Sequence, residues 1–180
     1  MKWTIVNAEA VAPQPWRNGG GITRELLAWP QSPDWTLRIS VADVEADGPF
    51  SRFEGIQRWF AILQGEGVRL FERDVHAGDT LLAFDGALAP DCTLLAGKVR
   101  DFNLMHRRQQ GRMAVVEAGQ PVQASADWFG LFTAEGGCLH AGTNQLHLPA
   151  MSLAWTVSAE AINCHFEGSG SAWWMSWWGQ

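Results

Sequence analysis

Short apolar segments separated by turns constrain this chain more than any other feature of its sequence. The 180 residues include 19 Gly and 8 Pro, and few stretches keep helical periodicity over the roughly ten residues that a helix needs. In residues 35–41, apolar side chains alternate with Thr36, Arg38 and Ser40, as on a half-buried strand. About thirteen such segments, spaced by roughly 8–15 residues, predict an all-β sandwich or barrel.

A faint internal repeat indicates two halves. Residues 75–82 and 146–153 each place a tight turn between two apolar segments, and they lie about 72 residues apart. We therefore expect a single domain, residues 1–180, made of two stacked halves. The N-terminal half covers about residues 1–105 and the C-terminal half about residues 106–180.

Tryptophan is concentrated near the end of the sequence. There are 11 Trp and no Tyr, and four Trp fall within residues 173–178. On a strand, Trp173 and Trp177 would face one way and Trp174 and Trp178 the other, so both faces would have to be covered. We expect a buried closing strand. The alternative is an exposed surface for another protein or for self-association, which would make the chain a homodimer.

Charge and composition exclude several classes of protein. With 19 acidic and 13 basic residues the formal net charge is −6, and the absence of a Lys/Arg block argues against nucleic acid as a partner. No apolar run approaches the roughly 20 residues of a membrane-spanning helix, and Asn7 and Glu9 interrupt the apolar stretch that a signal peptide needs. Cys92, Cys138 and Cys164 form no C-x-x-C pair, which argues against a disulfide framework and a thiolate zinc site. We expect a cytoplasmic protein with no membrane partner.

A glycine-rich segment at residues 15–25 is one candidate binding element. Gly19, Gly20 and Gly21 let the backbone approach a ligand closely, and successive amides in such a turn can cradle a carboxylate or a phosphate. The segment lacks the Gly-Lys-Ser/Thr ending of a nucleotide-binding loop. A plain turn is the alternative.

A second polar segment spans residues 101–108. If the strand continues, Asp101, Asn103 and Arg107 share one face while apolar residues pack the other. Such a row inside a small barrel is costly unless the groups pair with each other or with a ligand. The segment therefore forms either a polar pocket or a solvated sheet face.

Together these segments resemble, in order along the chain, the motifs of the HutD/Ves family. The matching segments are P-W-R-N-G-G-G (residues 15–21) with Thr23, R-I-S (38–40), D-G-P-F-S-x-F-x-G (47–55) and D-F-N-L-M (101–105) with Arg107. The resemblance covers most of residues 1–110, whereas residues 111–180 resemble the family in length and strand rhythm. It implies a bicupin, in which one chain forms two cupin-like β-barrel halves.

The resemblance also implies a function. For the HutD branch it implies a regulatory role in bacterial histidine utilisation and binding of N-formylglutamate or a similar small carboxylate. The Ves branch is cold- and stress-inducible. The sequence does not place the chain in one of the two branches.

Cupins often hold a metal through a His-x-His pair with a later Glu and a further His. No such pair occurs in the sequence, so we expect no metal and no other cofactor. The five histidines are His76, His106, His140, His147 and His165. One alternative stays open, in which the last three meet across strands of the C-terminal half.

The leading hypothesis is a non-enzymatic protein whose first half binds a small acidic metabolite. Of the 13 basic residues, 11 are Arg, and a guanidinium pairs with a carboxylate through two parallel hydrogen bonds. Arg38 and Arg107 are the expected carboxylate contacts. The predicted ligand-binding residues are Asn18, Gly19, Gly20, Gly21, Arg38, Asp101, Asn103 and Arg107.

The alternative is a metal-independent enzyme on the cupin scaffold, a hydrolase or isomerase of a small acidic or sugar-like metabolite. Asp101 or His106 would be its acid or base. Ser40 and Ser51 lack a glycine-flanked nucleophile elbow, and no Cys/His pair can be placed together from sequence. No catalytic residue is therefore assigned.

Overall fold

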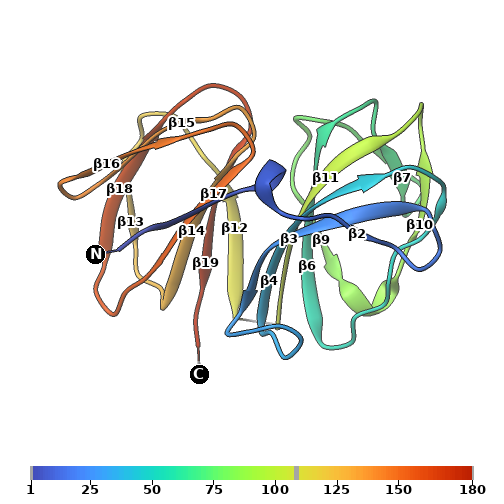
Figure 1. Ribbon diagram of the computed structural model, residues 1–180, viewed down its shortest axis with the longest axis horizontal. Helices are drawn as coiled ribbons and strands as arrows, with labels where there is room; N and C mark the ends of the chain where they lie inside the picture. The colour runs from blue at the N-terminus through green and yellow to red at the C-terminus, as the bar shows by residue number, and fades with distance from the viewer. Residues whose placement is uncertain (1, 108–109, 180) are drawn as a thin grey trace. The chain divides into compact units, whose positions relative to one another are not determined.

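Two compact units make up the computed structural model, which describes residues 2–107 and 110–179 (Figure 1). The first unit is Val11–Gln109, and the second unit joins Met1–Ala10 to Gln110–Gln180. The observed boundary lies close to the one expected near residue 105. The start of the chain departs from the expectation, because it belongs to the second unit and not to the first.

Two sheets form the first unit. The larger has the order β2-β3-β4-β11-β6-β9 and the smaller the order β5-β10-β7-β8. The strands are β2 (Gln14–Pro15), β3 (Gly21–Trp29), β4 (Leu37–Val44), β5 (Gly48–Pro49), β6 (Ile56–Gln64), β7 (Val68–Leu70), β8 (Arg73–Val75), β9 (Leu82–Asp85), β10 (Asp91–Leu94) and β11 (Val99–Arg107). A short 3-10 helix, η2 (Gly86–Leu88), follows β9. Phe60, Ile62 and Leu70 are buried in the core that both sheets share.

The second unit repeats this plan. Its larger sheet has the order β1-β17-β14-β19-β12 and its smaller sheet the order β13-β18-β15-β16. The strands are β1 (Thr4–Asn7), β12 (Gly111–Val115), β13 (Val122–Ala124), β14 (Trp128–Thr133), β15 (Gly137–Ala141), β16 (Asn144–Leu148), β17 (Ser152–Val157), β18 (Ile162–Glu167) and β19 (Ala172–Trp177). The 3-10 helix η1 (Ala8–Ala10) follows β1, which pairs with β17 along its whole length.

The strands β4 to β11 and the strands β12 to β19 have the same connectivity. In each set of eight, the first, eighth, third and sixth strands are neighbours in the larger sheet, and the second, seventh, fourth and fifth form the smaller sheet. A two-sheet jelly roll of eight strands is the cupin architecture, so the expected all-β bicupin is confirmed. The predicted repeat lies at the same connection in both units, since residues 75–82 join β8 to β9 and residues 146–153 join β16 to β17.

The tryptophan-rich segment forms a strand inside a sheet. β19 lies between β14 and β12, and Trp173, Trp174 and Trp177 are at most 9% exposed. Trp178 follows the strand and is 40% exposed. The expected buried strand is therefore present, although it is a central strand and not an edge.

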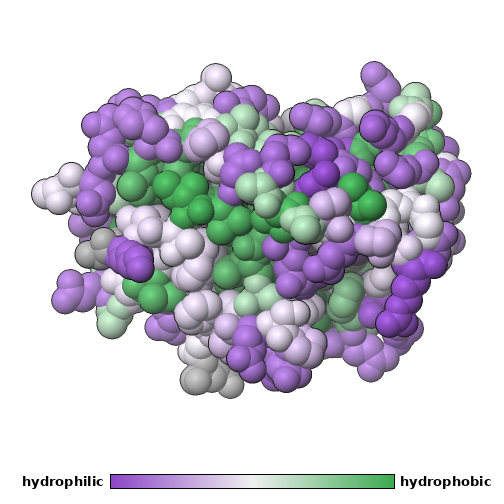
Figure 2. All heavy atoms as spheres, in the orientation of Figure 1, coloured by the Kyte–Doolittle hydropathy of each residue, from purple (hydrophilic) through white to green (hydrophobic). Residues whose placement is uncertain are grey.

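The surface mixes polar and apolar residues. On the face shown in Figure 2, hydrophilic side chains surround patches of hydrophobic ones in both units. Within residues 2–107 and 110–179, no helix is long and apolar enough to cross a membrane.

Candidate ligand-binding site

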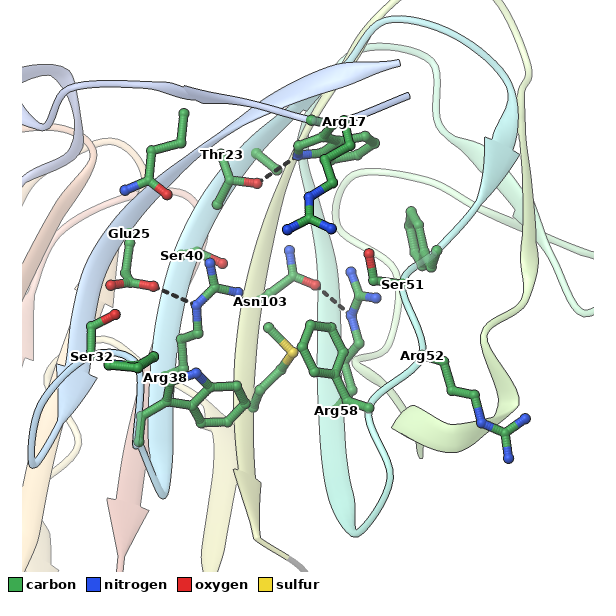
Figure 3. A pocket seen from close by; sticks show the side chains of 18 of the residues that line it. Arg17, Thr23, Glu25, Ser32, Arg38, Ser40, Ser51, Arg52, Arg58 and Asn103 are labelled. Atoms are coloured by element: carbon green, nitrogen blue, oxygen red, sulfur yellow. Dashed lines mark hydrogen bonds and ion pairs between the residues drawn. The ribbon is translucent and has the colours of Figure 1, made fainter. Parts of the chain in front are cut away.

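A pocket of about 730 Å³ opens on the inner face of the larger sheet of the first unit (Figure 3). This volume lies in the range of small-molecule sites. The lining residues come from β2, β3, β4, β5, β6, β11 and three loops. They include Trp16, Arg17, Asn18, Thr23, Glu25, Trp35, Arg38, Ser40, Phe50, Ser51, Arg58, Asn103 and Met105.

Strand alternation and register bring the polar side chains together. On β4, Arg38 and Ser40 face the pocket, whereas the intervening Ile39 is buried on the opposite face. The pairing of β11 with β4 sets Met105 opposite Arg38 and Asn103 opposite Ser40. On the other side of β11, the same Met105 lies opposite Arg58 of β6. Three adjacent strands therefore bring Arg38, Ser40, Asn103 and Arg58 to one face, with Met105 between the two arginines.

Arg58 is the deepest cation of the pocket. It is 7% exposed, its Nε donates to Asn103 Oδ1 at 2.7 Å, and its guanidinium lies 4.1 Å from the centre of the Phe50 ring. Burial lowers its pKa to about 10, although the nearby Asp101 acts in the opposite direction. Among the described residues, no carboxylate forms an ion pair with Arg58, and its terminal nitrogens Nη1 and Nη2 make no hydrogen bond.

Arg38 and Arg17 line the same pocket as Arg58 and add positive charge to it. Arg38 Nε donates to Glu25 Oε2 at 2.6 Å, which leaves the two terminal nitrogens of this guanidinium available to a ligand. In Figure 3, the guanidinium groups of Arg17, Arg38 and Arg58 point into the same space, while Arg52 points away from it. Among the described lining residues, Glu25 is the sole carboxylate. The pocket therefore carries an excess of positive charge.

Asp101 lies next to the pocket and does not line it. Asn103 Nδ2 donates to Asp101 Oδ1, so the Asn103 amide bridges Arg58 and Asp101. The Asp101 carboxyl is 1% exposed, and its Oδ2 has no hydrogen-bond partner among the described residues. Burial raises its pKa to about 7, although the charge of Arg58 and the bond from Asn103 act in the opposite direction.

This carboxyl predicts a pH dependence of stability. The usual pKa of Asp101 in an unfolded chain is near 3.8, so between that pH and about 7 the fold keeps a proton that the unfolded chain has released. The free energy of unfolding is therefore not reduced by Asp101 at low pH, and it falls as the pH rises toward about 7. Replacing Asp101 by Asn removes the titration. Between pH 5 and pH 7, the unfolding free energy of the parent protein is expected to fall by about 2 kcal/mol relative to Asp101→Asn. Urea denaturation at both pH values measures this, and parallel pH profiles would contradict it.

Arg107 and the three glycines lie outside the pocket lining. Arg107 belongs to the same face of β11 as Asn103, but four residues along a strand correspond to about 13 Å, and its side chain borders another hollow beside residues 52–56. In the glycine segment, Gly19 N donates to Trp16 O and Gly20 N to Asn18 Oδ1. These amides are used inside the turn and do not form an anion cradle.

The glycine turn positions its neighbours instead. A Cβ on Gly21 would lie 2.3 Å from the Asp43 carbonyl oxygen and 3.2 Å from the Trp16 ring, so glycine is needed for this close approach. Trp16 Nε1 in turn donates to Thr23 Oγ1 at 2.7 Å. The turn thereby fixes Trp16 and presents Asn18 to the pocket.

Sequence reasoning thus named Asn18, Arg38 and Asn103 among the lining residues and missed Arg58 and Glu25. A signal for Arg58 existed in the sequence. Arg58, Phe60 and Ile62 occupy every second position and so share one face of a strand, and an arginine in such an apolar row indicates a buried polar contact.

The pocket does not fit the metal that cupins often hold. Among the described residues, no histidine or cysteine lines it, and its one carboxylate is paired with Arg38. His106 lies on the face of β11 opposite to Asn103. Its ring is hydrogen-bonded to Trp59 Nε1 and to the Arg107 carbonyl oxygen. No metal is therefore assigned to this pocket.

Comparison with known proteins supports the sequence resemblance. The family model HutD matches residues 8–174. The chain belongs to the HutD family. The matched residues extend well into the second unit, whereas the motifs recognised in the sequence all lie within residues 15–107.

Two relatives and one solved structure are close to this HutD-family chain. An uncharacterised 21.2 kDa protein in the hutC 3′ region of Pseudomonas putida is 35% identical over 139 residues, which cover 72% of this chain and 73% of that protein. Protein Ves of Citrobacter koseri is 32% identical over 155 residues, covering 74% and 81%. HutD from Pseudomonas fluorescens SBW25, in a formate condition, shares the fold with a TM-score of 0.85 at 22% identity, over 99% and 100% of the two chains.

Proposed function

We propose that the pocket of the first unit binds a small carboxylate, with N-formylglutamate as the best candidate, and that binding regulates histidine utilisation in the cytoplasm. The observation that carries this proposal is Arg58, a buried guanidinium with no carboxylate paired to it among the described residues. A buried cation without a counter-ion is costly, and an anionic ligand would supply the missing charge.

The rest of the pocket suits such a ligand. Arg38 and Arg58 present terminal nitrogens to one space, and each guanidinium can hold a carboxylate through two hydrogen bonds. Two arginines favour a ligand with two acidic ends. Asn18, Ser40 and Ser51 offer hydrogen bonds to the middle of such a ligand.

The link to histidine utilisation in this proposal comes from the family. The Pseudomonas putida relative is named for the hutC 3′ region, and the structural neighbour from Pseudomonas fluorescens is named HutD. Both names point to histidine utilisation. N-formylglutamate, the ligand implied by the resemblance, carries two carboxylates, in keeping with the paired arginines.

Calorimetric titration tests the ligand class. N-formyl-L-glutamate should bind one per chain, and formate or urocanate, each with one carboxylate, should bind more weakly. The neutral diamide of N-formylglutamate should give no heat, because it lacks the charges that Arg38 and Arg58 would meet. Equal binding of the diamide would contradict the charge-based site. No binding of any acid would contradict the function.

Arg38 provides the first mutational test. Arg38→Ala should weaken carboxylate binding about ten- to a hundredfold, the effect of losing a charge-assisted pair of about 1.5–3 kcal/mol. The same change leaves Glu25 unpaired in the pocket, which adds repulsion. Arg38→Lys should recover part of the affinity, since it keeps the charge without the fork. Circular dichroism checks folding, and unchanged affinity in folded Arg38→Ala would exclude Arg38 from the site.

A catalytic function of the same pocket is the less favoured hypothesis. The candidate acid or base residues, Asp101 and His106, do not line it, and Glu25 is paired with Arg38. Because no free proton-transfer group faces the ligand space among the described residues, the geometry favours binding over catalysis.

A further inference from the structure

The outer face of the smaller sheet of the second unit gathers metal-binding side chains. On β15 and β18, Leu139 and Phe166 point into the core, so the residues that alternate with them face outward. The pairing of the two strands sets His140 directly opposite His165. Glu167 lies two residues further along β18, on the same outward face.

Three donor atoms converge there. Glu167 Oε2 lies 3.4 Å from His140 Nε2, and Glu167 Oε1 lies 3.6 Å from His165 Nε2. The two imidazole rings are parallel, with their centres 4.4 Å apart. One ligand atom from each of the three residues falls within 4.8 Å of the other two. Small side-chain rotations would bring all three to bonding distance of one ion, about 2.0–2.2 Å for zinc.

We propose that His140, His165 and Glu167 form a binding site for a divalent transition metal, with Zn²⁺ as the expected ion. Two imidazoles and one carboxylate are a donor set that zinc uses in proteins, with solvent completing the coordination. This site is separate from the carboxylate pocket, which lies in the other unit, and from the interior of either jelly roll.

Burial and partner contacts favour a metal over a plain ion pair. His140 Nε2 is shielded from solvent yet makes no hydrogen bond among the described residues, since even Glu167 Oε2, 3.4 Å away, is not hydrogen-bonded to it. Glu167 is 62% exposed, so water can reach the ion from its side of the cluster. A salt bridge at this position would require protonated imidazoles, whereas a metal would bind their neutral form.

The sequence expectation of no metal rested on the lack of a His-x-His pair. Here the two imidazoles come from strands far apart in sequence, and strand register alone makes them neighbours. Part of the alternative left open from sequence is realised, since His140 and His165 meet. His147 pairs opposite Cys138, one row away, and is outside the three-atom cluster.

Zinc titration of the full chain, purified without a metal-affinity tag, tests the site. Competition with a chromogenic chelator at neutral pH should show one Zn²⁺ per chain. His165→Gln and Glu167→Gln should each weaken binding about tenfold or more, because each removes a ligand. The matched control is His147→Gln, which removes an exposed histidine of the same sheet and should leave the affinity unchanged.

A second readout guards against misfolding of a variant. Zinc should raise the melting temperature of the parent chain and of His147→Gln, since a ligand bound to the folded state stabilises it, and should have little effect on His165→Gln. No zinc binding by the parent chain, or binding that survives both His165→Gln and Glu167→Gln, would overturn the proposal. Neither result bears on the carboxylate pocket.

Discussion

Replacing Trp174 by alanine is expected to lower the free energy of unfolding by about 3–5 kcal/mol. Trp174 is 6% exposed and stacks on Phe129, with ring centres 5.4 Å apart and planes inclined by 17°. It lies on β19, a central strand of its sheet. The loss is a large part of the roughly 5–15 kcal/mol that stabilises a typical domain, so the transition midpoint in urea should fall strongly.

Trp178→Ala is the matched control. Trp178 is 40% exposed, and its Nε1 donates to the Ser125 carbonyl at 2.8 Å, so its loss should cost about 1 kcal/mol. Deletion of residues 172–180 removes the whole of β19 and should abolish cooperative unfolding. Equal effects of Trp174→Ala and Trp178→Ala would show that β19 does not pack as described.

The same strands carry opposite chemistry in the two units. In the first unit, β6 and β11 supply Arg58 and Asn103 to the space between the sheets. The corresponding strands of the second unit, β14 and β19, supply Phe129 and Trp174 to a hydrophobic core. Equivalent strands of the repeated fold thus line a polar pocket in the first unit and a hydrophobic core in the second.

Alternation was the part of the sequence that translated directly into structure. The segment at residues 35–41 correctly placed Arg38 on the face opposite Ile39, and the row in residues 101–105 correctly turned Asn103 inward. Period-two patterns are local, so they can be read without knowing which strands pair. The buried tryptophan strand followed from the same reasoning.

Distance along and across strands could not be read in this way. Strand alternation put Arg107 on the same face as Asn103, but it does not show how far a pocket extends along the strand, and Arg107 borders another hollow. The partners of Arg38 and Arg58, which are Glu25 and Asn103, depend on strand order and register. The cluster of His140 and His165 depends on the register of β15 with β18. None of these pairings has a local signature.

Arg58→Met is expected to weaken carboxylate binding about a hundredfold without lowering stability at pH 6. Burial lowers the pKa of the Arg58 guanidinium from its ordinary value to about 10, so the charged form is disfavoured in the fold by about 3 kcal/mol. Methionine keeps a long apolar side chain beside Phe50, where the Arg58 guanidinium lies over the ring, and removes that charge. At pH 6, below its pKa of about 7, Asp101 is mostly protonated, so no unpaired carboxylate is left behind.

The combination of lost affinity and retained stability separates a ligand-binding role from a structural one. A structural arginine would cost about 3–5 kcal/mol of stability when removed from a buried pair and would leave the affinity of the folded fraction intact. Calorimetric titration with N-formyl-L-glutamate and urea denaturation, both at pH 6, measure the two quantities. Arg69→Met is the control, since Arg69 is exposed on β7 and paired with Asp74, and it should change neither. A destabilised Arg58→Met protein that binds normally would reverse the assignment, because Arg58 would then serve the fold and the pocket would lose its central cation.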